Sequence, residues 1–199
     1  AANFTNERGV DGRIRFLHNV MGLWLLNESV TYWAQQGANQ SVAQWVTKAA
    51  DYSGERVVFD VNDPTFMVPG DIPVRIAQWC EEHDVAAPES EVATVASIIE
   101  SLATAFSDAV HTAAELSGKR ISTINVVGGG SQIELLLQRL ADVSGCEVAA
   151  GPVEATALGN LLVQARSAGM VRGNLDTLRA LVRRAFSPRV FSPQLGAVI

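Results

Sequence analysis

Three consecutive glycines are the residues of this sequence with the clearest chemical potential. Gly128, Gly129 and Gly130 follow an apolar β-branched run at 124–127 and precede leucines that repeat at helical spacing. Because glycine has no Cβ, a ligand can come close to the main chain at such a turn. A helix that starts just after the turn offers unpaired N–H groups and a partial positive charge to an anion. A tight strand-to-helix turn that binds nothing has the same pattern, so the glycines alone leave both interpretations open.

Two common phosphate-binding motifs do not fit this turn. The dinucleotide fingerprint G-x-G-x-x-G requires a third glycine where this sequence has Ile133. The acidic residue that binds the ribose should end the second strand, whereas Glu147 begins it. A Walker A loop requires G-x-x-x-x-G-K-[ST], which Gly118-Lys119-Arg120 does not supply. A ligand at this turn is therefore neither a Rossmann dinucleotide nor a P-loop nucleotide.

Other segments must position this turn, and local signals predict them. Asp11-Gly12 between two short runs predicts a β-hairpin, and Ser41 and Gly118 predict a helix start and a helix end. The predicted helices cover 20–36, a segment after Ser41, 72–83, about 90–116, the leucines at 135–140, 154–168 and 175–185. The predicted strands cover 57–61, 124–127 and 147–150, and residues 186–199 are expected to be a loosely ordered tail.

Composition restricts the class of protein. The 199 residues are 48% hydrophobic, which predicts one compact domain with a substantial core. A net charge of −6 without a basic run argues against a nucleic-acid or anionic-membrane surface. No apolar run reaches 18 residues, so no membrane span is expected. The first residue is Ala1, without an initiator Met or a signal peptide, and we therefore expect a part of a longer protein.

The two cysteines indicate a reducing environment. Cys80 and Cys146 lie in neither a C-x-x-C nor a Cys/His spacing, so no zinc site is predicted. We expect two free, buried thiols and a cytoplasmic protein.

Three segments together resemble the FGGY carbohydrate kinases. They are HNVMGLWLL at 18–26, VVGGGSQ at 126–132 and AGPVEATALGN at 150–160, and the resemblance runs from Ala1 to about Gly169. It is greatest to members of the family that phosphorylate L-rhamnulose. The resemblance implies an α/β chain of the ribonuclease-H-like (actin-like ATPase) class, with helices packed on a mixed sheet. It also implies that residues 1–199 form the C-terminal, nucleotide-binding lobe of a two-lobe kinase.

The resemblance further assigns roles to single residues. Gly129 is expected to contact the nucleotide, with Gly128 and Gly130 beside it. Asn27 stands where the family usually has a glutamine near the nucleotide, and a solvated helix residue is the alternative. Asn19 matches an asparagine on the sugar side of the cleft, or it caps the following helix.

Two further residues near these motifs have open roles. Ile133 replaces a polar amide that often follows the GGGSQ motif, which leaves the selectivity for the nucleotide base open. Glu154 could reach the site, but its place at a helix start favours an interaction with the helix dipole.

The resemblance implies a reaction that this chain cannot perform alone. The parent protein would use ATP and Mg²⁺ to phosphorylate the 1-hydroxyl of a ketose, namely L-rhamnulose, with L-fuculose and D-xylulose as alternatives. The family carries its catalytic Asp and its D-x-G-T phosphate loop on the N-terminal lobe, and these motifs do not occur here. No catalytic residue and no metal ligand is thus expected in this chain. A non-catalytic binding module with the same fold is the alternative from another functional class.

Overall fold

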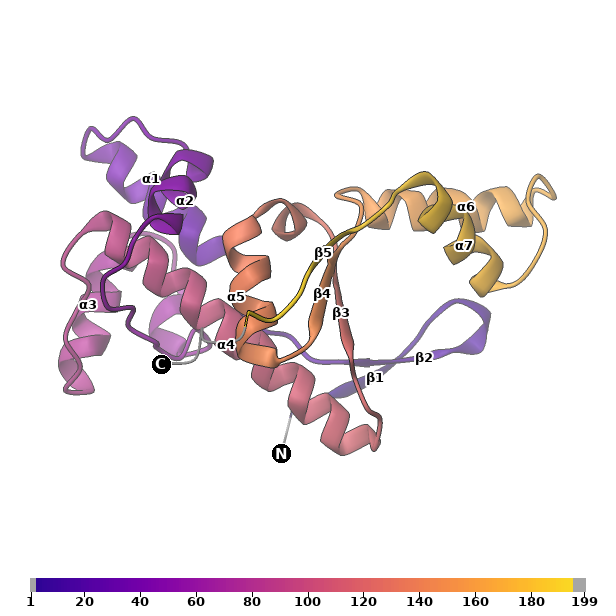
Figure 1. Cartoon of the computed structure of the whole chain (residues 1–199), viewed down its shortest axis with the longest axis horizontal. Coiled ribbons are helices and arrows are strands. Elements are labelled where there is room, and N and C mark those ends of the chain that lie inside the picture. The colour runs from indigo at the N-terminus through magenta and orange to yellow at the C-terminus, as the bar shows by residue number, and fades with distance from the viewer. Residues whose placement is uncertain (1–2, 195–199) are drawn as a thin grey trace.

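A computed structural model describes residues 3–194, and all the predicted helices are present in it (Figure 1). The helices are α1 Trp24–Gln35, α2 Val42–Ala50, α3 Ile72–Glu82, α4 Glu91–Ser117, α5 Glu134–Ser144, α6 Ala155–Ser167 and α7 Leu175–Ala185. The strands are β1 Thr5–Arg8, β2 Ile14–Leu17, β3 Thr123–Val126, β4 Glu147–Ala150 and β5 Arg189–Phe191. Three short 3-10 helices are η1 Val10–Gly12, η2 Pro64–Met67 and η3 Gly129–Gln132.

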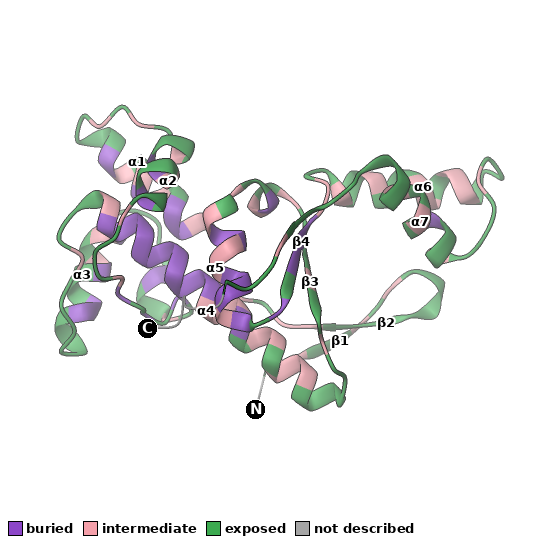
Figure 2. Cartoon of the chain, in the orientation of Figure 1, coloured by how far each residue is buried: buried purple, intermediate pink, exposed green. Residues whose placement is uncertain are grey.

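Helix α4 forms the centre of the core. The Ser90 hydroxyl accepts a hydrogen bond from the N–H of Ala93 at the start, and Gly118 ends the helix in a left-handed conformation. The sequence predicts one buried face, but every residue from Ala93 to Ala103 is buried, because other segments surround this half of the helix (Figure 2). By length and composition α4 could span a membrane, yet 61% of its most apolar window is buried inside the protein.

A buried ion pair joins α4 to α5. The Arg139 guanidinium donates two hydrogen bonds of 2.7 Å to the Glu100 carboxylate. It also donates to Asp142 at 3.3 Å, and both carboxylates are on buried residues. These contacts, led by the hydrogen bonds to Glu100, raise the pKa of Arg139 above its ordinary value. Since an unpaired buried charge is costly, the pair fixes how α5 lies along α4.

The strands form a hairpin and a small mixed sheet. Strands β1 and β2 pair antiparallel across a turn in which Asp11 and Gly12 both have positive φ, as predicted. In the second sheet β4 is central, parallel to β3 and antiparallel to β5. Helix α5 connects β3 to β4 and packs against β4. The predicted α/β class with helices on a mixed sheet is thus confirmed.

The predicted strand at 57–61 is wrong. Val57, Phe59 and Val61 are buried and Val58 is exposed, which is the alternation of a strand. However, the backbone N–H groups of Val57 and Phe59 donate to serine hydroxyls of α4, each at 3.0 Å, and not to another strand. The segment can stay extended without a neighbouring strand, because the serine hydroxyls of α4 accept hydrogen bonds from its backbone N–H groups.

The predicted loose tail is wrong over β5. Residues Arg189–Phe191 pair with β4, and the N–H of Gln194 donates to Asp142 at 2.9 Å. The Ser-Pro pairs at 187–188 and 192–193 therefore flank a strand and do not end the order. Residues 195–199 of the predicted tail lie outside the described residues.

The hairpin, α6 and α7 lie at the opposite end of the molecule from α1–α3 (Figure 1). Arg166 of α6 forms a two-pronged ion pair with Asp11 in the hairpin turn, and Arg13 donates to Asp176 of α7 at 3.4 Å. No residue of α6 is buried and Leu178 is the buried residue of α7, while the two ion pairs tie these helices to the hairpin turn (Figure 2).

Candidate nucleotide site at the glycine turn

The glycine turn lies between β3 and α5 and is tied to the end of β4. The N–H of Gly151 donates to Val126 at 2.8 Å, and the N–H of Gly128 donates to Pro152 at 3.3 Å. Within the turn, the Ser131 hydroxyl donates to the carbonyl oxygen of Gly128 at 2.7 Å. These bonds hold the turn at the carboxyl ends of two parallel strands, where α/β folds commonly bind ligands.

The three glycines have different reasons to be glycine. Gly128 has a φ of 79°, a conformation that other residues rarely adopt. A Cβ added to Gly130 would make ordinary contacts of 3.8 Å with Leu23 and Val126. A Cβ on Gly129 would meet no atom within 4 Å, and its φ is not left-handed. Nothing in the described chain therefore requires a glycine at 129, whereas close approach of a ligand would.

A cavity of about 650 Å³ opens beside the turn. Asn27 from α1 and Gly129 and Ile133 from the turn all line it, so the structure brings these predicted site residues together. Among the described residues the Asn27 side chain has no hydrogen-bond partner, and it is exposed. The other lining residues are Leu23, Leu26, Val42, Ala43, Val46, Thr47, Ala50, Gln132, Glu134 and Leu135.

Helix α2 supplies one wall of this cavity, a role that was not predicted from the sequence. Trp45 and Ala49 point into the core, while Val42 and Val46 are only partly buried and line the cavity. Val42, Trp45, Val46 and Ala49 form one apolar face at i, i+3, i+4 and i+7, and this pattern does not reveal that one edge of the face stays outside the core. A capping box between Ser41 and Gln44 fixes the start of α2.

Helix α5 presents its N-terminus to the cavity. Its N-cap residue, Ile133, makes no side-chain capping hydrogen bond, so the first N–H groups of α5 are not capped by a side chain. An anion near this end would meet the positive end of the helix dipole. The cavity therefore combines apolar walls with one site that favours negative charge.

Asn19 does not line the cavity at the glycine turn. It is exposed, and its neighbours His18 and Val20 line a second hollow of about 580 Å³ that also contains Asp60 and Asp108. Helix α1 starts at Trp24, with Leu23 as its N-cap residue, so the alternative role of Asn19 as a helix cap is wrong.

Glu154 does not line the cavity at the glycine turn. It directly precedes α6 as its N-cap residue and makes no side-chain capping hydrogen bond. Its place at the start of the helix suits an interaction with the dipole.

Comparisons with known proteins show the family of this chain. The family model described as "FGGY family of carbohydrate kinases, C-terminal domain" matches residues 1–168. A rhamnulokinase of Enterococcus faecalis is 36% identical over 95% of this chain, and one of Bacteroides thetaiotaomicron is 35% identical over 98%. The chain spans 38% and 39% of the lengths of these two relatives.

A solved structure shows the same fold. The ligand-bound xylulose kinase from Lactobacillus acidophilus matches 96% of this chain and 38% of its own, with a TM-score of 0.58 and 14% identity. The gluconate kinase from the same organism has a TM-score of 0.55 over 96% of this chain and 38% of its own, at 15% identity. The chain belongs to the FGGY family of carbohydrate kinases and has the actin-like ATPase fold of that family's C-terminal domain.

Proposed function

We propose that this chain is the C-terminal, nucleotide-binding lobe of a cytoplasmic, ATP-dependent kinase that phosphorylates L-rhamnulose on its 1-hydroxyl. The cavity at the glycine turn carries the proposal, because Gly129, Asn27 and an uncapped helix start converge on it. The relatives that are 35 to 38% identical are rhamnulokinases, which supports this ketose over the others.

The cavity suits the parts of ATP in different places. The apolar wall formed by Val42, Val46 and Ile133 would pack on the adenine ring, and the Asn27 amide could donate or accept a hydrogen bond. The bare backbone of Gly129 would let the ribose or the α-phosphate approach closely. The remaining phosphates would extend out of this lobe.

Mg²⁺ would reach the site with the nucleotide. Among residues 3–194, no group of three His, Cys, Asp or Glu side chains is placed to hold a metal ion. The phosphates and residues of an N-terminal lobe of the same polypeptide would therefore hold Mg²⁺, which offsets negative charge during phosphoryl transfer. The present chain would bind and orient the nucleotide and exclude water when the two lobes approach.

The test is ADP release by the full-length protein with Mg·ATP and L-rhamnulose, L-fuculose or D-xylulose in parallel. We expect a strong preference for L-rhamnulose and no turnover by residues 1–199 alone. Equal turnover of another ketose would contradict the proposed substrate. Absence of ATP-dependent turnover with every sugar would instead favour a non-catalytic binding module.

A further inference from the structure

The C-terminal strand sends one charged side chain to the glycine turn. Arg189, the first residue of β5, donates through Nη2 to the carbonyl oxygen of Ser131 at 3.1 Å. Its Nη1 forms an ion pair with the Glu134 carboxylate. Ser131 and Glu134 stand on either side of Gln132 and Ile133, which both line the cavity. The Arg189 guanidinium thus connects the two ends of the segment 131–134, which borders the cavity.

Glu134 presents an electrostatic problem for an anionic ligand. It is the first residue of α5 and lines the cavity, so it adds a negative charge to the helix N-terminus that would otherwise attract phosphate. A carboxylate close to a polyphosphate repels it, and an adjacent cation offsets that repulsion. Within the described part of the chain, Arg189 is the cation that pairs with Glu134.

Strand β5 does not depend on Arg189 for its place. The Gln138 amide donates to the carbonyl oxygen of Ser192 at 2.9 Å, and the N–H of Gln194 donates to Asp142 at 2.9 Å. Backbone pairing with β4 adds to these contacts. The Arg189 side chain is 53% exposed, so its removal should leave the strand in position.

We propose that Arg189 is a positioning residue for ATP, acting on the nucleotide through Ser131 and Glu134. It fixes the turn through the Ser131 carbonyl oxygen and neutralises the Glu134 carboxylate at the helix start, where the α-phosphate would approach. This inference rests on the proposed nucleotide site, and it assigns a role in that site to the C-terminal strand.

The experiment uses the full-length protein with the Arg189→Met variant. We expect the KM for Mg·ATP to rise about fivefold, the upper range for an exposed charge pair, while the KM for the ketose stays unchanged. The double variant Glu134→Gln/Arg189→Met should return the KM for ATP to within about twofold of the wild-type value, because no carboxylate then remains unpaired. Arg189→Lys should recover part of the loss, since it keeps the charge but not the two-pronged geometry.

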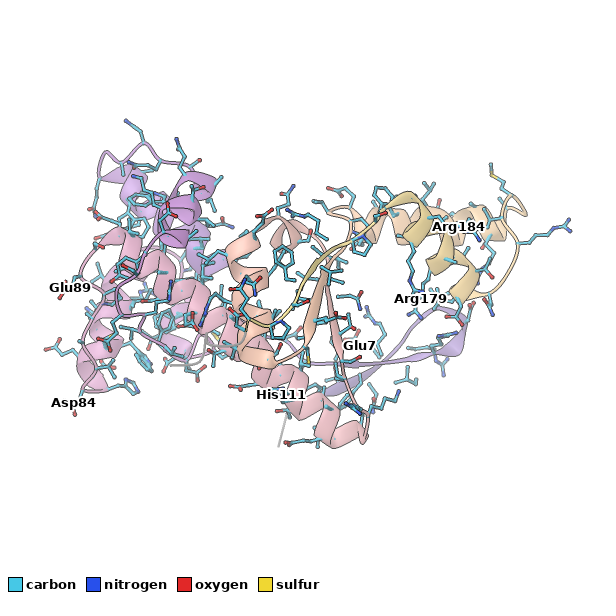
Figure 3. All side chains as sticks on the ribbon, in the orientation of Figure 1. Glu7, Asp84, Glu89, His111, Arg179 and Arg184 are labelled. Carbon is cyan, nitrogen blue, oxygen red and sulfur yellow. The ribbon has the colours of Figure 1, made fainter. Side chains whose placement is uncertain are left out.

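Arg179→Met is the matched control. Arg179 lies on α7 (Figure 3), and its ion pair with Asp176 is as exposed as the Arg189 pair, at 55% against 53% for the arginine side chains. We expect this variant to leave both KM values unchanged. An unfolding temperature of Arg189→Met equal to that of Arg179→Met would establish that the effect is not a loss of folding.

The outcomes separate this inference from the proposed function. If the wild type uses ATP but Arg189→Met leaves the KM for ATP unchanged, the positioning role is overturned and the kinase stands. A raised KM that Glu134→Gln does not relieve would overturn the electrostatic part of the role. If the wild type shows no ATP-dependent turnover, both the proposed function and this inference fail.

Discussion

Substitution of Gly129 by valine tests the nucleotide site most simply. The φ of Gly129 is not left-handed, and a Cβ there would meet no atom of the protein within 4 Å. The folded chain should therefore tolerate the side chain, and the unfolding temperature should stay within about 4 °C of the wild type. The branched side chain would instead occupy the space into which we place the nucleotide.

The expected size of the effect is that of one lost hydrogen bond between a backbone N–H of the turn and the α-phosphate, which the valine side chain would keep at a distance. A hydrogen bond between a backbone N–H and a charged group contributes about 1.5 to 3 kcal/mol. Since about 1.4 kcal/mol is a factor of ten, Gly129→Val should raise the KM for ATP about 10- to 100-fold. Gly129→Ala should have a smaller effect, because its single methyl group fills less of the opening.

Steady-state kinetics of the full-length protein, with ATP and ketose varied separately, measures this effect. Gly159→Val is the matched control, because a Cβ on Gly159 of α6 would also meet no atom within 4 Å, its φ is not left-handed, and it does not line the cavity. We expect this control to change neither KM. An equal rise of both KM values in Gly129→Val, or no change in either, would refute the placement of the nucleotide at the turn.

Three further changes probe the site and the fold. Val46→Asp places a carboxylate on the apolar wall of the cavity, and we expect a higher KM for ATP at an unchanged KM for ketose in the same kinetic assay. Ser101→Ala leaves the buried N–H of Phe59 without its acceptor, so urea unfolding should show a loss of about 1 to 3 kcal/mol, and no loss would contradict our account of this segment. Hydrogen bonds from Thr65 lower the pKa of Asp63 below its ordinary value of 3.8. This carboxylate therefore stabilises the fold at pH values above 3.8, and its contribution is lost as the pH falls through the lowered pKa. As the pH is lowered from about 6 to 2, the unfolding temperature of Asp63→Asn should fall less than that of the wild type. An equal fall in both proteins would count against this assignment.

The elements with local signals were predictable from the sequence. Ser41 and Ser90 both act as helix caps, and Gly118 ends α4 in the conformation that glycine favours. The hairpin followed from Asp11-Gly12 in the same way. These residues determine their structure through neighbours within a few positions, so no knowledge of the fold was needed.

The errors arose where the backbone forms hydrogen bonds with segments that are distant in the sequence. The burial pattern of Val57, Phe59 and Val61 alternates as in a strand. However, the N–H groups of this segment donate hydrogen bonds to serine hydroxyls on α4, where those of a strand would donate to a neighbouring strand. Strand β5 was missed because its order comes from pairing with β4 and from Asp142, which the sequence around 189–191 does not reveal. Both cases depend on contacts between distant segments.

The site was only partly predictable for the same reason. The resemblance pointed to Gly129 and Asn27, and the structure places both on one cavity. The wall formed by α2 was missed, because its single apolar face does not show which of its residues remain outside the core. The link from Arg189 to Glu134 joins segments 55 positions apart, and no spacing rule connects them.

The most direct test of the central claim is to locate the bound nucleotide. Photolabelling of the full-length protein with 8-azido-ATP, followed by mass spectrometry of the peptides, would report the residues next to the adenine. We expect label on α2 at 42–50 or on the segment 129–135, with protection by excess ATP, because these segments line the cavity. Protectable label around His18 and Asp60, in the second hollow, would contradict a nucleotide site at the glycine turn.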